Sequence, residues 1–204
     1  MDLVLIHGMG RTPLSMLLLR HRLNRLGFNP HLFGYIPALE SLQRATDRLV
    51  DMLHCKISHR RYALVGHSLG TVIIRNALPH LIDNQPSACF FLAPPMVACK
   101  AAKFFSKFWL YQVLTGEMGQ LLAQETFMVQ LELPRNARIY VGTGGPRASW
   151  LPFGQEVNDC ILSVGESCGP YTDGVVKVPS THTFIMSSPV VAKDIAASLK
   201  NLAC

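Results

Sequence analysis

Short, uninterrupted apolar runs alternate along the chain with longer stretches whose apolar residues recur at helical spacing. Uninterrupted runs are typical of strands that are buried on both faces of a sheet, and the longer stretches are typical of helices that cover it. The expected strands lie near residues 3–7, 29–34, 61–65, 88–92, 138–142 and 175–178. This alternation predicts an α/β fold in which about six mostly parallel strands carry helices on both faces.

Capping residues mark the ends of the first expected helix. Thr12 offers a hydroxyl N-cap, Pro13 suits the first helical position, and Gly27 suits a left-handed C-cap. A helix is therefore expected over roughly 13–26. Further helices are expected over 39–54, over 71–78 and from Ser188 onward.

The whole chain, 1–204, is expected to form a single domain. Its 204 residues suffice for one core, and the sequence has no internal repeat, low-complexity segment or interdomain linker. The least regular region is 143–172, which is rich in Gly, Pro, Ser and Asn. A loop this long usually serves a functional site in a compact domain, so we expect site residues within it.

The segment Gly66–Gly70 fits the pattern G-x-S-x-G and lies between an expected strand and an expected helix. A serine hydroxyl is a poor nucleophile at neutral pH and must project from the backbone toward a base. Glycines two positions to either side permit the tight turn, called a nucleophile elbow, that exposes such a serine. The N-terminus of the following helix adds free N–H groups and a positive dipole end. We therefore interpret Ser68 as a nucleophile rather than an incidental serine of a glycine-rich turn.

A second glycine-flanked turn, His7-Gly8-Met9-Gly10, directly follows the first expected strand. The N–H of Met9 and the N–H of Leu69, just after the serine, are expected to form an oxyanion hole. The turn lacks the G-x-G-x-x-G and GK[ST] patterns of nucleotide-binding loops, which argues against a phosphate cradle. We interpret His7 as a residue that braces the loop and not as a base.

The base is expected to be a histidine that follows the last strand. His182, in the segment VPSTHTFIM, has this position among the eight histidines of the chain. Most of the others lie on or beside expected helices and strands that face elsewhere, and His67 is expected to point away from Ser68. We interpret His182 as the general base, with a capping residue ahead of the last helix as the alternative.

Two aspartates compete for the role of orienting that imidazole. Asp159 follows the expected strand 138–142 and leaves room for a further strand before His182. Asp173 lies near the start of the expected strand 175–178, at the end of the sheet opposite the site. A four-residue strand rises only about 13 Å, so Asp159 is preferred and Asp173 stays open.

With Ser68, Asp159 and His182 in this chain order, the sequence resembles the α/β-hydrolase superfamily. It is most similar to small bacterial lipase/esterase-like members, which lack the first two strands of the larger fold. The resemblance spans nearly the whole chain through LVLIHGMG, ALVGHSLGT, the strand end at Gly142-Thr143 and VPSTHTFIMSSP. In relatives the acid commonly stands in an Asp-Gly pair, whereas this chain has NDCILSVGES at the matching place and an Asp-Gly pair later, in TDGVV.

The resemblance implies a minimal α/β-hydrolase fold that cleaves carboxylic esters through an acyl-enzyme. It implies Ser68 as nucleophile, His182 as general base and acid, Asp159 as orienter, and the Met9 and Leu69 N–H groups as oxyanion hole. We expect an acyl ester or lipid-like small molecule as substrate and neither a metal nor an organic cofactor. A thioesterase, amidase or acyltransferase, or a non-catalytic binding protein on the same scaffold, are the alternatives.

Charge and cysteine content add little to this interpretation. The net charge is +6, but the Lys and Arg residues are dispersed without a nucleic-acid-binding motif, so no nucleic acid partner is expected. The six cysteines have no metal-binding spacing and are expected to be free thiols. The N-terminus has no basic leader, so a cytoplasmic protein is expected.

The segment 101–114, AAKFFSKFWLYQVL, gathers five aromatic residues after the fourth expected strand. Aromatic residues at helical spacing more often belong to a core, which is the interpretation we prefer here. The alternative is an amphipathic, lipid-facing helix that would make a weak contact with a membrane surface.

Overall fold

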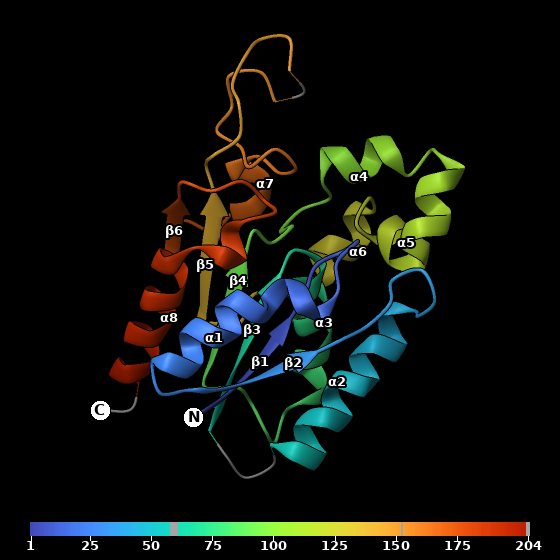
Figure 1. Ribbon diagram of the computed structural model, residues 1–204. Coiled ribbons are helices and arrows are strands. Elements are labelled where there is room, and N and C mark those ends of the chain that lie inside the picture. The colour runs from blue at the N-terminus through green and yellow to red at the C-terminus, as the bar shows by residue number, and fades with distance from the viewer. Residues whose placement is uncertain (58–60, 152, 203–204) are drawn as a thin grey trace.

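The computed structural model describes residues 1–57, 61–151 and 153–202. Within them one six-stranded sheet runs in the order β2-β1-β3-β4-β5-β6, and every neighbouring pair is parallel. The strands are β1 (Asp2–Ile6), β2 (Asn29–Phe33), β3 (Tyr62–His67), β4 (Ala88–Leu92), β5 (Ala137–Gly142) and β6 (Val175–Val178) (Figure 1). The predicted α/β architecture with six parallel strands is confirmed.

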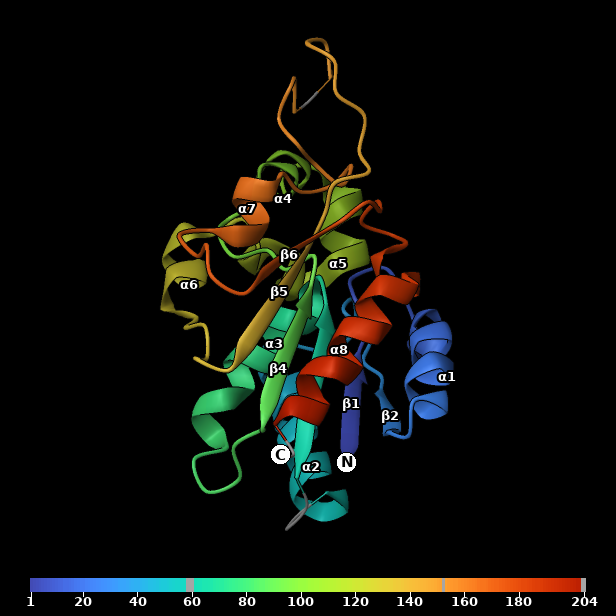
Figure 2. The same ribbon diagram turned by 90° about the vertical axis from the view of Figure 1, so that its left-hand side faces the viewer.

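Helices cover both faces of this sheet. On one face lie α1 (Leu17–Arg25) and α8 (Pro189–Asn201), and on the other lie α2 (Leu42–Lys56) and α3 (Leu69–Ala77) (Figure 2). The remaining helical segments are η1 (Pro13–Met16), η2 (Leu78–His80), α4 (Lys100–Phe105), α5 (Trp109–Leu121), α6 (Glu125–Gln130), α7 (Val164–Cys168) and η3 (Ile185–Ser187).

The apolar runs of the strands supply two cores at once. Side chains alternate between the two faces of a strand. In β1, Leu3 and Leu5 pack beneath α1 and α8, whereas Val4 and Ile6 pack beneath α2 and α3, and all four are fully buried. Burial of one such side chain stabilises the fold by about 1.5–3 kcal/mol. A run without polar positions is therefore what a sheet covered on both faces requires.

Some helix ends differ from those predicted. The second predicted helix begins at Leu42, because the side chain of Ser41 caps it by accepting a hydrogen bond from the Arg44 N–H at 3.1 Å. The helix predicted over 71–78 begins at Leu69, directly after the serine of the elbow. The first predicted helix opens as the 3₁₀ turn η1 and becomes an α-helix at Leu17.

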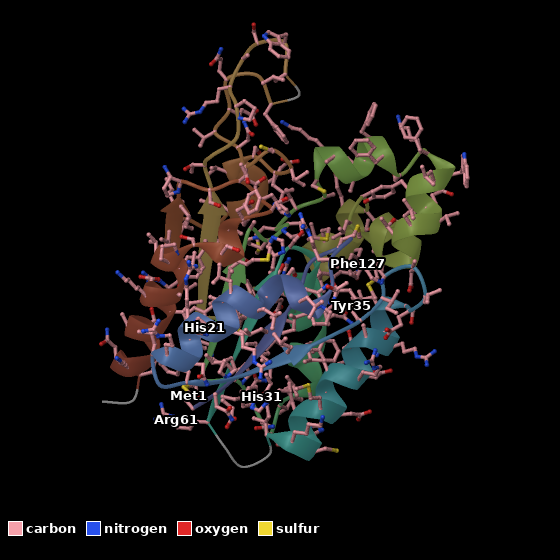
Figure 3. The ribbon with its side chains drawn as sticks, in the orientation of Figure 1. Met1, His21, His31, Tyr35, Arg61 and Phe127 are labelled. Atoms are coloured by element: carbon pink, nitrogen blue, oxygen red, sulfur yellow. The ribbon has the colours of Figure 1, made fainter. Side chains whose placement is uncertain are left out.

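The carboxyl ends of the parallel strands meet at one edge of the sheet. Helices α4, α5 and α6 lie above this edge, and the loop that follows β5 projects beyond it (Figure 1). Met1 and Arg61 lie at the opposite end of the strands, whereas Tyr35 lies toward the carboxyl edge (Figure 3). Ligand sites of open α/β sheets form at the carboxyl edge, so this is where the predicted site residues must gather.

The five cysteines within the described residues are unpaired, and Cys204 lies outside those residues. None of the described helices combines the length and the apolar character that a membrane crossing needs.

Candidate active site

Ser68 occupies a strained corner between β3 and α3. Its backbone has φ 50° and ψ −118°, a conformation that residues other than glycine rarely adopt. A Cβ atom at Gly70 would lie 2.5 Å from the carbonyl oxygen of Ile6, and one at Gly66 would lie 2.8 Å from the Thr71 nitrogen. Glycine is therefore required at both positions, because backbone passes too close for any side chain.

Hydrogen bonds on both sides hold this corner in place. The Ser68 N–H donates to the carbonyl of Leu92 at 2.9 Å, which ties the corner to the end of β4. The Thr71 hydroxyl donates to the Ser68 carbonyl at 2.7 Å, within the first turn of α3. The serine thus stands at the N-terminus of a nine-residue helix, where the dipole favours negative charge.

His182 and Asp159 form a buried pair at the carboxyl edge. His182 Nδ1 lies 2.7 Å from Asp159 Oδ2, and the His182 backbone N–H donates to the Asp159 carbonyl at 2.8 Å. Asp159 Oδ1 accepts from the N–H groups of Ile161 and Leu162 at 2.9 and 2.7 Å. Because Asp159 is fully buried and both of its oxygens are bonded, its carboxylate is fixed in one orientation.

Asp173, the other aspartate considered, is not brought to His182. It is exposed and immediately precedes Gly174, whose carbonyl accepts from the Ile139 N–H at the start of the β5–β6 pairing. That position is the amino end of these strands, away from the edge at which His182 and Asp159 meet. Of the two aspartates, the geometry joins only Asp159 to the imidazole.

His67 is closer to the site than we expected. Its Nε2 lies 3.0 Å from the His182 carbonyl oxygen, and the two rings are 5.0 Å apart between centroids. Because a carbonyl only accepts, Nε2 carries the proton, and Nδ1 is left as a buried lone pair without a hydrogen-bond partner among the described residues. Burial, with His182, Arg11 and His7 nearby, holds the pKa of His67 well below its ordinary value.

His7 braces the loop that follows β1. Its ring stacks on Tyr35 at 4.3 Å, Nδ1 donates to the Gly8 carbonyl at 2.9 Å, and Nε2 accepts from the Tyr35 N–H at 3.4 Å. The Tyr35 hydroxyl donates to the His7 carbonyl at 2.9 Å. Burial lowers the pKa of His7 and so favours the neutral ring that this bonding pattern needs.

The loop after β1 approaches the serine through Gly8. A Cβ atom at Gly8 would lie 2.7 Å from His67 Nδ1 and 3.1 Å from Ser68 Cβ. Neither the Met9 N–H nor the Leu69 N–H has a hydrogen-bond partner within the part of the chain that the structure describes. Each of the two glycine-rich turns therefore carries one N–H donor, of Met9 or of Leu69, that is unoccupied among the described residues.

A cavity of about 260 Å³ opens beside Ser68 and His182. Its wall includes Met9, whose sulfur accepts from the Tyr111 hydroxyl at 3.9 Å, so α5 contacts the loop that follows β1. The other lining residues are Arg11, His67, Pro95, Cys99, Ala101, Ala102, Phe105, Leu122, Ile161, Leu162 and Thr183. Most of these are apolar, which suits a hydrocarbon ligand.

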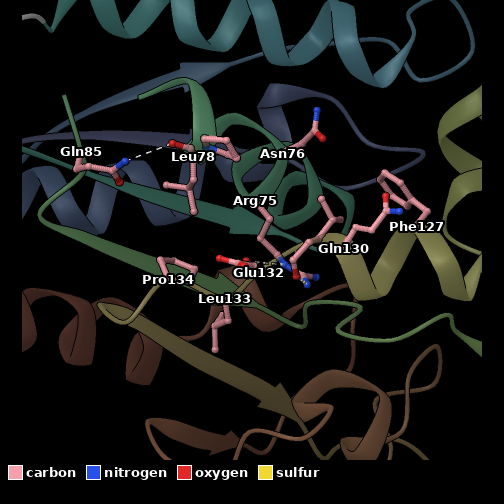
Figure 4. Close-up of a pocket in the computed structure, with 11 residues that line it drawn as sticks. Arg75, Asn76, Leu78, Gln85, Phe127, Gln130, Glu132, Leu133 and Pro134 are labelled. Atoms are coloured by element: carbon pink, nitrogen blue, oxygen red, sulfur yellow. Dashed lines mark hydrogen bonds between the residues drawn. The ribbon is translucent and has the colours of Figure 1, made fainter. Parts of the chain in front are cut away.

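Another cavity lies away from these residues, between α3, α6 and the segment that leads into β5 (Figure 4). It measures about 580 Å³, and the buried guanidinium of Arg75 lies at its wall. Arg75 donates to the backbone carbonyls of Pro95, Met128, Leu131 and Glu132. Burial lowers the pKa of Arg75 to about 10. No predicted site residue lines this cavity, and Arg75 serves to fasten α6 and the loop after β4 to α3.

The interpretation of 101–114 as core is wrong. Trp109 is 73% exposed, and Phe104, Phe105 and Phe108 are between 48% and 59% exposed. The three phenylalanine rings pack on one another, with Phe104 and Phe105 edge to face at 5.2 Å. Helical spacing brought them to a common face of α4 and α5, but no other element covers that face within the described residues.

Comparisons with known proteins agree with this architecture. No family model and no curated protein matches the sequence. The mature lipase BlEst2 of Bacillus licheniformis is similar in structure at a TM-score of 0.72, with 16% identity over 98% of this chain and 91% of that one. The RedJ thioesterase of Streptomyces coelicolor gives a TM-score of 0.61, with 16% identity over 98% of this chain and 85% of that one.

A third similar structure carries the name of the fold. An extracellular α/β-hydrolase from a Paenibacillus species matches at a TM-score of 0.63, with 13% identity over 99% of this chain and 98% of that one. Such coverage at such low identity shows a shared fold. With six parallel strands and a serine corner after β3, the chain has the α/β-hydrolase fold.

Proposed function

We propose that this protein is a carboxylic ester hydrolase in which Ser68 is the nucleophile, His182 the general base and acid, and Asp159 the residue that orients His182. The observation that carries the proposal is the buried 2.7 Å contact between His182 Nδ1 and Asp159 Oδ2, beside the cavity that Ser68 lines. Because the carboxylate only accepts, Nδ1 holds the proton and Nε2 is free to act as base.

The reaction takes two steps. The Ser68 oxygen attacks the ester carbonyl carbon while its proton moves to His182 Nε2. The resulting tetrahedral intermediate expels the alcohol, which takes the proton from His182, and the acyl group stays on the serine. Water then attacks the acyl-enzyme, gives its proton to His182, and releases the acid as the Ser68 oxygen regains a proton.

The oxyanion of each tetrahedral intermediate would accept from the N–H groups of Met9 and Leu69. Both donors are free among the described residues, and Leu69 begins the helix that follows the serine. Loss of one such donor typically raises the barrier by about 3–4 kcal/mol.

A thioesterase is the second candidate. The same residues would attack a thioester carbonyl by the same two steps, and the RedJ thioesterase is among the structurally similar proteins. Rates with matched oxygen and sulfur esters of one acid separate the two activities.

A fluorophosphonate probe tests the nucleophile directly. We expect the native protein to be labelled and Ser68→Ala to be unlabelled, with hydrolysis of p-nitrophenyl butyrate lost in the same variant. A folded native protein that neither reacts with the probe nor cleaves the ester would contradict the proposal and favour a non-catalytic binding protein.

The exposed aromatic face of 101–114 supports a further part of the proposal, a weak contact with an anionic phospholipid surface. The face borders the Ser68 cavity through Phe105 and Tyr111, and the chain carries a net charge of +6. Exposed apolar patches of this kind mark interaction sites. We expect phosphatidylserine vesicles to retain the protein more than phosphatidylcholine vesicles, and Trp109→Ser to weaken both; equal retention of protein and variant would argue against the contact.

The dispersed, unpaired cysteines of the described residues suggest the cytoplasm as the place of this reaction, and cell fractionation tests that part.

A further inference from the structure

A second cavity lies against the one that Ser68 lines. It measures about 490 Å³ and is formed between α4 and residues 153–161 of the long loop. Ala101, Phe105 and Ile161 line both cavities, so the two share one wall. The other residues around the second cavity are Lys100, Phe104, Phe153 and Cys160.

The side chains that separate the two cavities, called the rim below, are partly exposed and do not pack into the core. Phe105 is 48% exposed and Ile161 is 45% exposed, so neither side chain is fixed in the core. Ala101 is too small to close the space between them. The backbone of Ile161 is nevertheless held in place, because its N–H donates to Asp159 Oδ1 at 2.9 Å. One side of the rim therefore has a fixed position relative to His182.

The lining of the second cavity offers few free polar groups to a ligand. Lys100 carries the one charge among its lining residues, and its ammonium group already pairs with the Glu156 carboxylate at 3.4 Å. The Lys100 backbone N–H is occupied as well, by Glu166 Oε1 at 2.6 Å. Burial and the nearby Asp159 raise the pKa of the Cys160 thiol, which favours its neutral form. Aromatic rings and aliphatic groups make up the rest.

We propose that this second cavity binds the hydrocarbon chain of the ester substrate, which runs from the carbonyl at Ser68 across the rim at Ala101, Phe105 and Ile161. The inference rests on the proposed ester hydrolysis and names its substrate class, esters with a long unbranched chain. At about 260 Å³ the Ser68 cavity by itself is smaller than usual ligand pockets, which span about 300–1,000 Å³, whereas the two cavities together fall within that range.

The proposal predicts a dependence on chain length. Each buried methylene favours binding by up to about fourfold, so kcat/KM should rise through several methylenes and level off only after the second cavity is filled. The chain can belong to the acid or to the alcohol. The test is kcat/KM for two series of esters, each below the concentration at which the ester forms micelles. One series consists of p-nitrophenyl esters from acetate to laurate, and the other consists of butyrate esters from ethanol to dodecanol.

Cys160 allows the second cavity to be filled without a change at Ser68, His182 or Asp159. Its thiol is exposed, whereas Cys89 and Cys99 are buried. In a variant with Cys55→Ser, Cys168→Ser and Cys204→Ser, Cys160 is alkylated with N-cyclohexylmaleimide. The matched control keeps Cys55, which is exposed on α2, and carries Cys160→Ser, Cys168→Ser and Cys204→Ser. Cys160→Trp provides the same obstruction if the thiol reacts slowly.

We expect the obstruction at residue 160 to lower kcat/KM at least about tenfold for the longest esters of one series and to leave acetate or ethyl esters within about twofold. The series affected assigns the chain to the acid or the alcohol. Alkylated Cys55 should leave both series unchanged. An equal loss for short and long esters, or no loss in either series, would overturn the proposal. Cleavage of p-nitrophenyl acetate that needs Ser68 tests the ester hydrolase separately, and it can succeed while the second cavity proves irrelevant.

Discussion

Asp159 and His182 contact each other twice, through the 2.7 Å bond between Oδ2 and Nδ1 and through the 2.8 Å bond from the His182 N–H to the Asp159 carbonyl. The side chain of Asp159 thus fixes the ring of His182, and the backbone carbonyl of Asp159 fixes the backbone of His182. Residues 23 apart in sequence are held as one unit at the carboxyl edge of the sheet.

Asp159→Asn is expected to lower kcat by about 10³- to 10⁴-fold. The Asn oxygen can still accept from the Ile161 and Leu162 N–H groups, so its amide nitrogen will face His182 Nδ1. That donor forces the proton of the imidazole onto Nε2, where it cannot take the proton of Ser68. Steady-state kinetics with p-nitrophenyl butyrate measure the loss.

Asp173→Asn is the matched control, because Asp173 is exposed at the other end of the strands. We expect its kcat to stay within about twofold of the native value. A larger loss in Asp173→Asn than in Asp159→Asn would transfer the orienting role to Asp173.

The strands could be predicted because their apolar runs report burial on both faces. The serine corner could be predicted as well, since glycine is the one residue that fits where a Cβ at position 70 would meet the Ile6 carbonyl. The sequence was less informative at residue 160. That position has φ 85°, a conformation that favours glycine, yet it holds cysteine, so the usual Asp-Gly pair is absent at Asp159.

Two features could not be predicted because they depend on tertiary contacts. The spacing of the aromatic residues in 101–114 predicts a common face but not whether another element covers it, and the face is exposed. The contact of His67 with the His182 carbonyl joins residues 115 apart in the sequence, so no local sequence pattern predicts it.

His67 is expected to act as a positioning residue for His182. In His67→Gln the amide nitrogen can replace Nε2 as donor to the His182 carbonyl, whereas His67→Leu leaves that buried carbonyl without its partner. A displacement of about 1 Å can cost about 100-fold in rate. We expect a loss of that order in kcat for His67→Leu with little change in KM, and a loss below about tenfold for His67→Gln.

A merely structural role for His67 predicts a different result. Both variants would then lose thermal stability while kcat and the pH profile of kcat/KM for the remaining folded enzyme stayed native. Equal kcat values for the Leu and Gln variants would rule out the positioning role.

The buried neutral state of His67 should also make stability depend on pH. Its pKa in the folded protein lies well below the ordinary 6.5, first because of burial and then because His182, Arg11 and His7 are near. Below pH 6.5 the unfolded chain takes up a proton at this ring and the folded chain does not. The free energy of unfolding therefore falls as pH falls, by up to about 1.4 kcal/mol per pH unit from this group.

Urea unfolding between pH 7.5 and 5 measures this dependence in the native protein and in His67→Gln. The variant lacks the titrating ring, so its stability should fall less steeply below pH 6.5. Parallel curves for the two proteins would show that His67 takes up its proton equally in both states.

Gly70→Ala is expected to lower both stability and activity. The added Cβ would lie 2.5 Å from the Ile6 carbonyl oxygen and 2.7 Å from that of His7, and neither backbone atom can move without displacing β1 and the loop of Met9. Overpacking of this kind costs about 1–3 kcal/mol, and each kcal/mol lowers the melting temperature by about 2–4 °C in a domain of this size.

Gly165→Ala is the matched control. A Cβ atom at Gly165, in α7, would meet nothing closer than the Ser163 hydroxyl at 3.8 Å. The melting temperature of this variant should therefore hold or rise slightly. Calorimetry that found the two alanine variants equally stable would mean that the close approach of α3 to the end of β1 does not exist in solution.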